Sequence, residues 1–178
     1  MGLMIKGEFT PEEIAFVENL GPKDFWTVVN LPEEAETYGA EPCAYYEKGY
    51  FALVHAISLL RLIDEEKAKL LDAVRVEIEQ PDNRRDEIVH LYLITLENVK
   101  RIYELIRNMP AEMPQLHDDD YFLLPQYEEA VERTDCSLYH LSYNEKKKMI
   151  DLSVGQVKQL IKFLELAINK ERDIVLDY

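Results

Sequence analysis

Apolar side chains recur at every third or fourth position along most of the chain, the period of helices that bury one face. The first such stretch begins at residues 10–13, Thr-Pro-Glu-Glu, a capping box with proline at the first helical position, and Gly21 follows as a stop signal. These signals predict a helix over residues 11–20. Residues 43–63 are apolar on nearly every side and predict a central helix surrounded by other elements.

Two further periodic stretches predict long helices. Asp64 is a suitable N-cap for a helix over residues 65–79, which Pro81 terminates. Residues 82–108 form the longest periodic stretch, with apolar positions on one face at Ile88, Leu91, Leu96, Val99, Ile102, Tyr103 and Ile106. Four helices joined by short connections favour an antiparallel arrangement.

The remaining segments predict smaller elements. Prolines and a glycine divide residues 22–42 into short helical turns, and three prolines make residues 109–125 an irregular connection. The last part of the chain predicts a short helix over residues 127–133, a β-hairpin of residues 137–143 and 147–152, and a final helix over residues 153–172 that Ser153 caps.

These elements together predict a mainly α fold: an antiparallel bundle of four to six helices with a small C-terminal β-hairpin and a final helix. We expect one domain over residues 1–178, with the bundle core at 10–108, the connection at 109–125, and the short helix, hairpin and last helix at 126–178. A chain of this length buries about 70% of its unfolded surface, so neither disulfides nor metals are required for stability.

The charge balance narrows the range of partners. The 178 residues include 35 acidic and 20 basic side chains, and the formal net charge is -15. Such a field disfavours broad electrostatic binding to nucleic acid or anionic lipid, and it suits a basic protein or a cation. Residues 1–47 are strongly acidic, with Lys6 and Lys23 as their only bases, and we interpret them as a solvated surface.

Cysteine usage and hydropathy indicate the environment. Cys43 and Cys136 have no metal-ligand spacing, so we predict no metal and no cofactor. Two lone thiols are typical of a reducing compartment, and we expect a cytoplasmic location. The longest apolar stretch, residues 44–63, is interrupted by Glu47, Lys48, His55 and Arg61. We therefore expect no membrane span.

One group of side chains has the chemistry of a catalytic site: Arg85, His90 and Tyr92, in the order Arg-x-x-x-x-His-x-Tyr near the start of the helix predicted over residues 82–108. Around it, residues 62–106 resemble part of a HEPN (higher eukaryote and prokaryote nucleotide-binding) domain of the toxin type. The resemblance implies a metal-independent ribonuclease whose site forms between the two subunits of a homodimer. Arg85 would then hold the phosphate and His90 would transfer a proton.

Helix geometry gives an independent expectation for His90. On the predicted helix it lies almost opposite the apolar stripe, in line with Glu97 and Glu104, yet Leu93 and Ile94 flank it. A histidine within a second apolar surface indicates either burial beneath the C-terminal segment or a subunit interface. We favour burial, because short motifs often occur without a function.

Other candidate sites are incomplete. Glu87 and His90 have the spacing of half a di-iron site, but no second Glu-x-x-His is present. His55 lies among apolar neighbours in the predicted central helix, which favours a hydrogen-bonded core histidine over a metal ligand. His117-Asp118 and the glutamates of residues 128–132 lack the partner motifs that metal sites of these types require.

Two hypotheses of different classes follow. We favour a non-catalytic acidic protein that binds another protein, as a small regulator, antitoxin or immunity protein does; its support is the charge, the size and the lack of a complete catalytic set. The alternative is the HEPN-like ribonuclease with Arg85, His90 and Tyr92 in its site, and only this alternative has nucleic acid as a partner.

Overall fold

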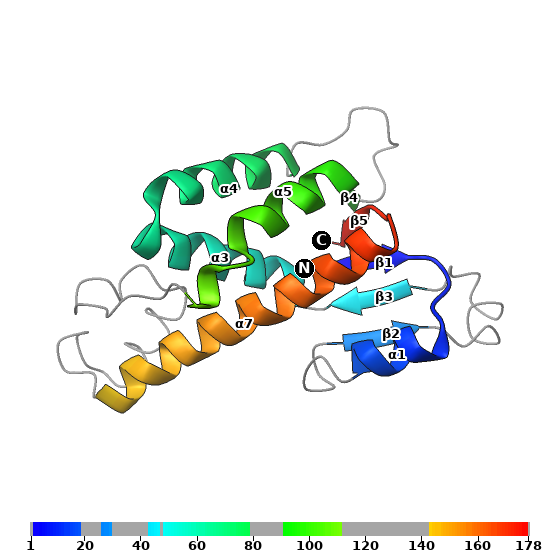
Figure 1. The fold of residues 1–178 in the computed structure, drawn as a ribbon, viewed down its shortest axis with the longest axis horizontal. Coiled ribbons are helices and arrows are strands. Elements are labelled where there is room, and N and C mark those ends of the chain that lie inside the picture. Colours follow the sequence, from blue (N-terminus) through cyan, green and yellow to red (C-terminus); the bar gives the residue numbers. More distant parts are fainter. Residues whose placement is uncertain are drawn as a thin grey trace.

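The computed structural model describes residues 2–18, 26–29, 43–46, 48–78, 91–111 and 143–177. In chain order the elements are β1 (Gly2–Lys6), α1 (Pro11–Glu18), β2 (Trp26–Val29), β3 (Cys43–Tyr46), α3 (Gly49–Ile63), α4 (Glu65–Ile78), β4 (Leu91–Ile94), α5 (Leu96–Ile106), the 3-10 helix η1 (Met109–Ala111), α7 (Tyr143–Asn169) and β5 (Ile174–Asp177) (Figure 1). The mainly helical class is confirmed. The structure adds an antiparallel sheet that the sequence did not predict.

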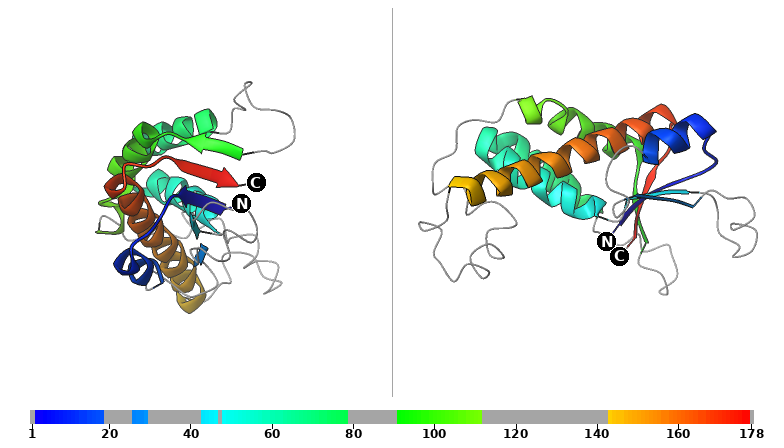
Figure 2. Two further views of the ribbon diagram at one scale, coloured as in Figure 1. Left: turned by 90° about the vertical axis from the view of Figure 1, so that its right-hand side faces the viewer. Right: turned by 90° about the horizontal axis from the view of Figure 1, so that it is seen from below.

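The sheet joins both ends of the chain. Its strand order is β2-β3-β1-β5-β4, and every neighbouring pair is antiparallel. The first strand, β1, lies at the centre and pairs with the last strand, β5, so that Leu3 is opposite Leu176. Figure 2 shows the helices gathered on one side of the twisted sheet. The fold therefore closes only when the two terminal strands meet.

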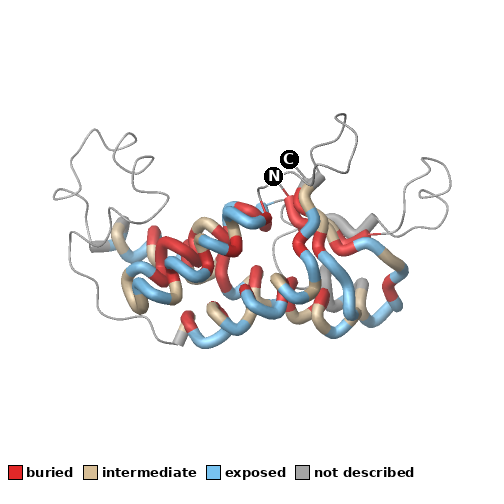
Figure 3. Tube along the Cα trace, turned by 90° about the horizontal axis from the view of Figure 1, so that it is seen from above, coloured by how far each residue is buried: buried red, intermediate tan, exposed pale blue. Residues whose placement is uncertain are grey.

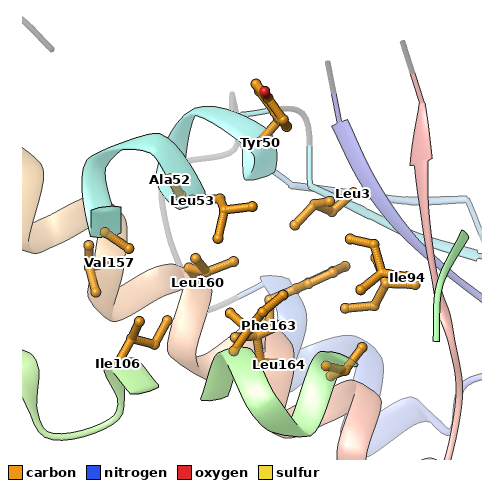
Figure 4. Close-up of a cluster of buried hydrophobic side chains, with 14 of the residues drawn as sticks. Leu3, Tyr50, Ala52, Leu53, Ile94, Ile106, Val157, Leu160, Phe163 and Leu164 are labelled. Atoms are coloured by element: carbon orange, nitrogen blue, oxygen red, sulfur yellow. The ribbon is translucent and has the colours of Figure 1, made fainter. Parts of the chain in front are cut away.

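One hydrophobic core connects the sheet to the helices. Alternate strand residues that face the helices are buried, as a period of two requires: Leu3, Ile5, Ala44, Tyr46, Ile94, Ile174 and Leu176. The ring of Phe163 in α7 lies 5.7 Å from the ring of Tyr46 in β3. Figure 4 shows Phe163 among other buried side chains between the helices and the sheet. A self-contained helical bundle is not confirmed, because this core includes both the sheet and the helices.

The end of α7 is held by local and tertiary contacts. Glu171 has a positive φ of 51°, and the amide of Arg172 donates to the carbonyl of Ala167, the pattern of a Schellman cap. Just before this turn, Lys170 Nζ donates to Glu13 Oε2 at 2.7 Å and lies 4.6 Å above the ring of Phe9. The hydrogen bond from Lys170 lowers the pKa of Glu13. These contacts tie the last helix to α1 and direct the chain into β5.

Two predicted helix starts are confirmed. At α1, Glu13 N donates to Thr10 Oγ1 at 3.3 Å and Thr10 N donates to Glu13 Oε2 at 2.8 Å, the reciprocal pair of a capping box. At α4, Lys67 N donates to Asp64 Oδ1 at 3.1 Å, as the predicted N-cap requires. The helix ends at Ile78, one residue from the predicted end.

The helix predicted over residues 82–108 is confirmed at Leu96–Ile106 but is not continuous. Leu91–Ile94 is strand β4, paired with β5, and a new helix, α5, starts at Leu96. Thr95 is extended, with ψ 152°, and caps α5 by accepting from Asn98 N at 3.4 Å. The short run Leu-Tyr-Leu-Ile satisfies a strand as well as a helix, and the partner strand decides between them.

Three further expectations are corrected. The second strand of the predicted hairpin, residues 147–152, is helical within α7, which continues the helical period upstream from Ser153. Cys43–Tyr46 is a strand rather than the start of the central helix, and Trp26–Val29 is a strand rather than a helical turn. The predicted first strand, residues 137–143, and the short helix, 127–133, lie outside the described residues apart from Tyr143, the first residue of α7.

Candidate protein-binding surface

The residues of the ribonuclease hypothesis are only partly described. Arg85 and His90 lie outside the described residues, as does Glu87. Tyr92 lies in β4 opposite Leu176, is half-buried, and packs against the hydrophobic core. It is therefore not on a helix, and its ring contributes to the fold. That Arg85 and His90 share a site stays a prediction of the ribonuclease hypothesis.

His55 is a hydrogen-bonded core histidine, as expected. Its Nδ1 lies 3.0 Å from the Oγ of Ser153, and the two residues join α3 to α7. His55 is 7% exposed and Ser153 is fully buried. Burial lowers the pKa of His55 to about 4. A serine beside a neutral histidine has the composition of a nucleophilic pair, but a substrate cannot reach atoms at this depth.

A second buried polar contact lies close to this pair along α7. The hydroxyl of Tyr46 donates to Gln156 Oε1 at 3.1 Å, and burial raises the pKa of the tyrosine well above its usual range. Because both groups are hydrogen-bonded, their burial is tolerated. The hydrogen bond also joins α7 to β3. Ser153, predicted as an N-cap, thus lies inside a helix and helps to bind it to the core.

The described residues contain no group suited to metal or thiol chemistry. No three metal-ligating side chains come together in this part of the chain. Cys43 is buried in β3, and burial raises the pKa of its thiol, which disfavours the reactive thiolate. Cys136, His117 and His140 fall outside the described residues.

An open groove lies between α4 and α5, which run side by side at the edge of the helical layer (Figure 1). It encloses about 390 Å³, and its lining residues are Leu70, Val74, Glu97, Lys100, Arg101, Glu104 and Leu105. Although four of these are charged, the surface they present to the groove is almost all apolar. The aliphatic stems of lysine and arginine explain this, because they lie along apolar surface while the charged ends remain in water.

Each of the two helices has one face buried in the core and another exposed to solvent. On α4, Leu71 is fully buried, whereas its neighbour Leu70 is 55% exposed. The inward face of α5 buries Val99, Ile102 and Ile106. Exposed and buried residues alternate along these helices in Figure 3. The groove is therefore apolar surface in excess of what the core uses.

Charged side chains border the groove along α5. Arg101 Nη1 lies 3.3 Å from Glu77 Oε2 of α4, an ion pair that bridges the two helices. Glu104 pairs with Arg107 at 3.0 Å. Within the described part of the chain, Glu97 and Lys100 have no ion pair, and both are exposed. The rim thus presents one acid and one base that a partner can reach.

The helical period of residues 65–79 does not by itself reveal this surface, because it contains two adjacent leucines, Leu70 and Leu71. Adjacent residues of a helix are separated by about 100° around its axis, so two adjacent leucines cannot both lie on one narrow apolar stripe. The sequence therefore indicates that one of the two leucines lies outside the buried stripe, but it does not indicate which helix packs beside that leucine to complete the groove.

No protein-family model matches the chain, and no curated protein or solved structure matches it either. None of the described helices combines the length and the apolar character that crossing a bilayer requires.

Proposed function

We propose that this protein acts without catalysing a reaction, by binding another protein of basic character. The observation that carries the proposal is the distribution of charge between two parts of the chain. Of the 35 acidic and 20 basic residues, 17 acids and 16 bases belong to the described residues, which leaves 18 acids and 4 bases in the remainder. The helices and the sheet are nearly neutral, and almost all of the net charge lies elsewhere in the sequence.

Two segments account for most of this charge. Residues 112–142 contain eight acids and one base, Arg133, and residues 30–42 contain four acids and no base. Charge concentrated in this way attracts a basic partner over several ångströms and repels polyanions. This concentration of acidic residues supports an electrostatic binding role of the kind that regulators, antitoxins and immunity proteins perform.

The test uses the full chain as bait in extracts of its own organism, followed by reconstitution of the complex from purified components. We expect a stoichiometric complex with a basic protein whose association constant falls as salt increases. Replacing Asp118, Asp119 and Asp120 with Asn should weaken binding about tenfold. The matched control replaces three exposed acids of the described body, Glu8, Glu65 and Glu171, with Gln, and should change binding less than about threefold.

Two results would overturn the proposal. One is a monomer that forms no complex with any basic protein at low salt. The other is a complex whose affinity depends neither on salt nor on residues 118–120.

The ribonuclease remains a second candidate because Arg85 and His90 retain the order and spacing of the family motif. It predicts cleavage of RNA without metal, lost in both Arg85→Ala and His90→Ala while circular dichroism shows both variants folded. A wild-type protein that leaves RNA intact would eliminate it, as would variants as active as the wild type.

A further inference from the structure

The groove between α4 and α5 has the form of a helix-binding site. Two packed helices make its walls, and Leu70 and Val74, one turn apart on α4, face Leu105 of α5 across it. A third helix laid in such a groove buries aliphatic side chains at positions i, i+3 or i+4, and i+7. The wall formed by α5 is 11 residues long, or about 16 Å, which accommodates roughly three turns of a partner helix.

The free charges on the rim restrict the partner further. Arg101 and Glu104 already have ionic partners in Glu77 and Arg107. Glu97 and Lys100 have none among the described residues, and they lie one turn apart on α5. A docked helix that places a base beside Glu97 and an acid beside Lys100 would satisfy both charges and fix its own direction.

We propose that this groove binds an amphipathic helix of a partner protein, with an aliphatic stripe on Leu70, Val74 and Leu105 and an oppositely charged pair against Glu97 and Lys100. A second copy of the chain is disfavoured as the occupant, because two molecules of net charge -15 repel each other. None of the residues that line the groove belongs to the acidic segments of the proposed function. The groove belongs to the nearly neutral body, and its binding energy comes mainly from apolar burial.

The experiment selects helical peptides of about 16 residues on the immobilised full-length protein. The peptide library has leucine at the positions that face the groove, and the positions that lie against its charged rim are randomised. On the wild-type protein, we expect the selected peptides to converge on one base and one acid, one turn apart. On the double variant Glu97→Lys with Lys100→Glu, the order of these two charges should reverse.

Matched leucine variants locate the binding. Leu70→Glu should weaken the selected peptides at least about tenfold, because it places a charge in the apolar lining. Leu152→Glu is the control, since Leu152 is 48% exposed on α7, outside the groove. It should leave peptide affinity unchanged. Thermal melts of both variants show whether the fold is retained.

Several results would overturn the inference: selection without convergence, peptides that bind Leu70→Glu as well as wild type, or charges that do not reverse in the double variant. Light scattering that finds a dimer dissociated by Leu70→Glu would assign the groove to a second copy and also overturn it. These failures leave the salt-dependent complex with a basic protein untouched, so the two proposals succeed or fail separately.

Discussion

The α3–α7 pair and the α4–α5 pair are both neighbouring helices, yet they use their facing surfaces differently. Between α3 and α7 the contact is continuous, and its polar groups are hydrogen-bonded, as His55 is with Ser153. Between α4 and α5 the helices meet over a shorter stretch, and an apolar groove remains open above it. The first pair uses its apolar surface to stabilise the fold, and the second leaves part of its apolar surface exposed to solvent.

The largest expected effect separates a core aromatic from a groove leucine. Phe163→Ala should lower the free energy of unfolding by about 3–5 kcal/mol, because its fully buried ring fills the space between α7 and β3. Leu70→Ala should cost less than about 0.5 kcal/mol, since Leu70 is half exposed. Urea unfolding of both variants measures this difference. A comparable loss in Leu70→Ala would mean that the groove is part of the core.

A second prediction concerns the pH dependence of the α3–α7 pair. Burial lowers the pKa of His55 to about 4 from an ordinary value of 6.5. Between these values the unfolded chain binds a proton that the folded chain does not, so the free energy of unfolding falls as the pH falls. The stabilisation that neutral, buried His55 contributes is fully present above about pH 6.5. By about pH 4 the free energy of unfolding has fallen by about 3 kcal/mol.

The variant His55→Gln isolates this contribution, because it keeps a hydrogen-bonding group beside Ser153 and removes the titration. Urea midpoints measured from pH 7 to pH 4.5 should fall more steeply for the wild type than for the variant. Carboxylates titrate in both proteins and cancel in the difference. Parallel profiles would show that His55 is accessible to water, contrary to its burial.

Two glycines give the smallest pair of effects, with opposite signs. A Cβ at Gly49 would lie 2.5 Å from Leu3 Cγ, at the contact between α3 and the sheet, so Gly49→Ala should cost about 1–3 kcal/mol. A Cβ at Gly155, within α7, would meet nothing within 4 Å. Gly155→Ala should therefore stabilise the protein by about 0.5–1 kcal/mol. Melting temperatures that shift in the same direction would contradict the prediction.

Local signals predicted the starts of α1 and α4 correctly. Residues 10–13 and Asp64 begin their helices by hydrogen bonds within a few residues, so the sequence nearby contains the whole interaction. The same reasoning identified His55 as a core residue, because an isolated polar group on an apolar helix needs only a partner on the next element. The mainly helical class followed from the same periodic pattern.

The strands could not be predicted from such signals. Leu91–Ile94 and Cys43–Tyr46 are only four residues long, and a run of that length fits either a strand or a turn of helix. Their conformation depends on β1 and β5 at opposite ends of the chain, which pair with one another at the centre of the sheet. The helix predicted around Tyr92 was wrong for this reason.

By itself, the sequence determined where α1 and α4 begin, which residues are apolar, and how acidic the chain is, because these properties depend only on the residues themselves and their neighbours in the chain. Only the tertiary structure decided which of two adjacent leucines, Leu70 or Leu71, is buried and which lines a groove. That choice depends on how α4 packs against its neighbours α3 and α5. Which apolar residues form the core and which line the exposed groove is therefore decided by packing, and the periodicity of a single helix does not contain that information.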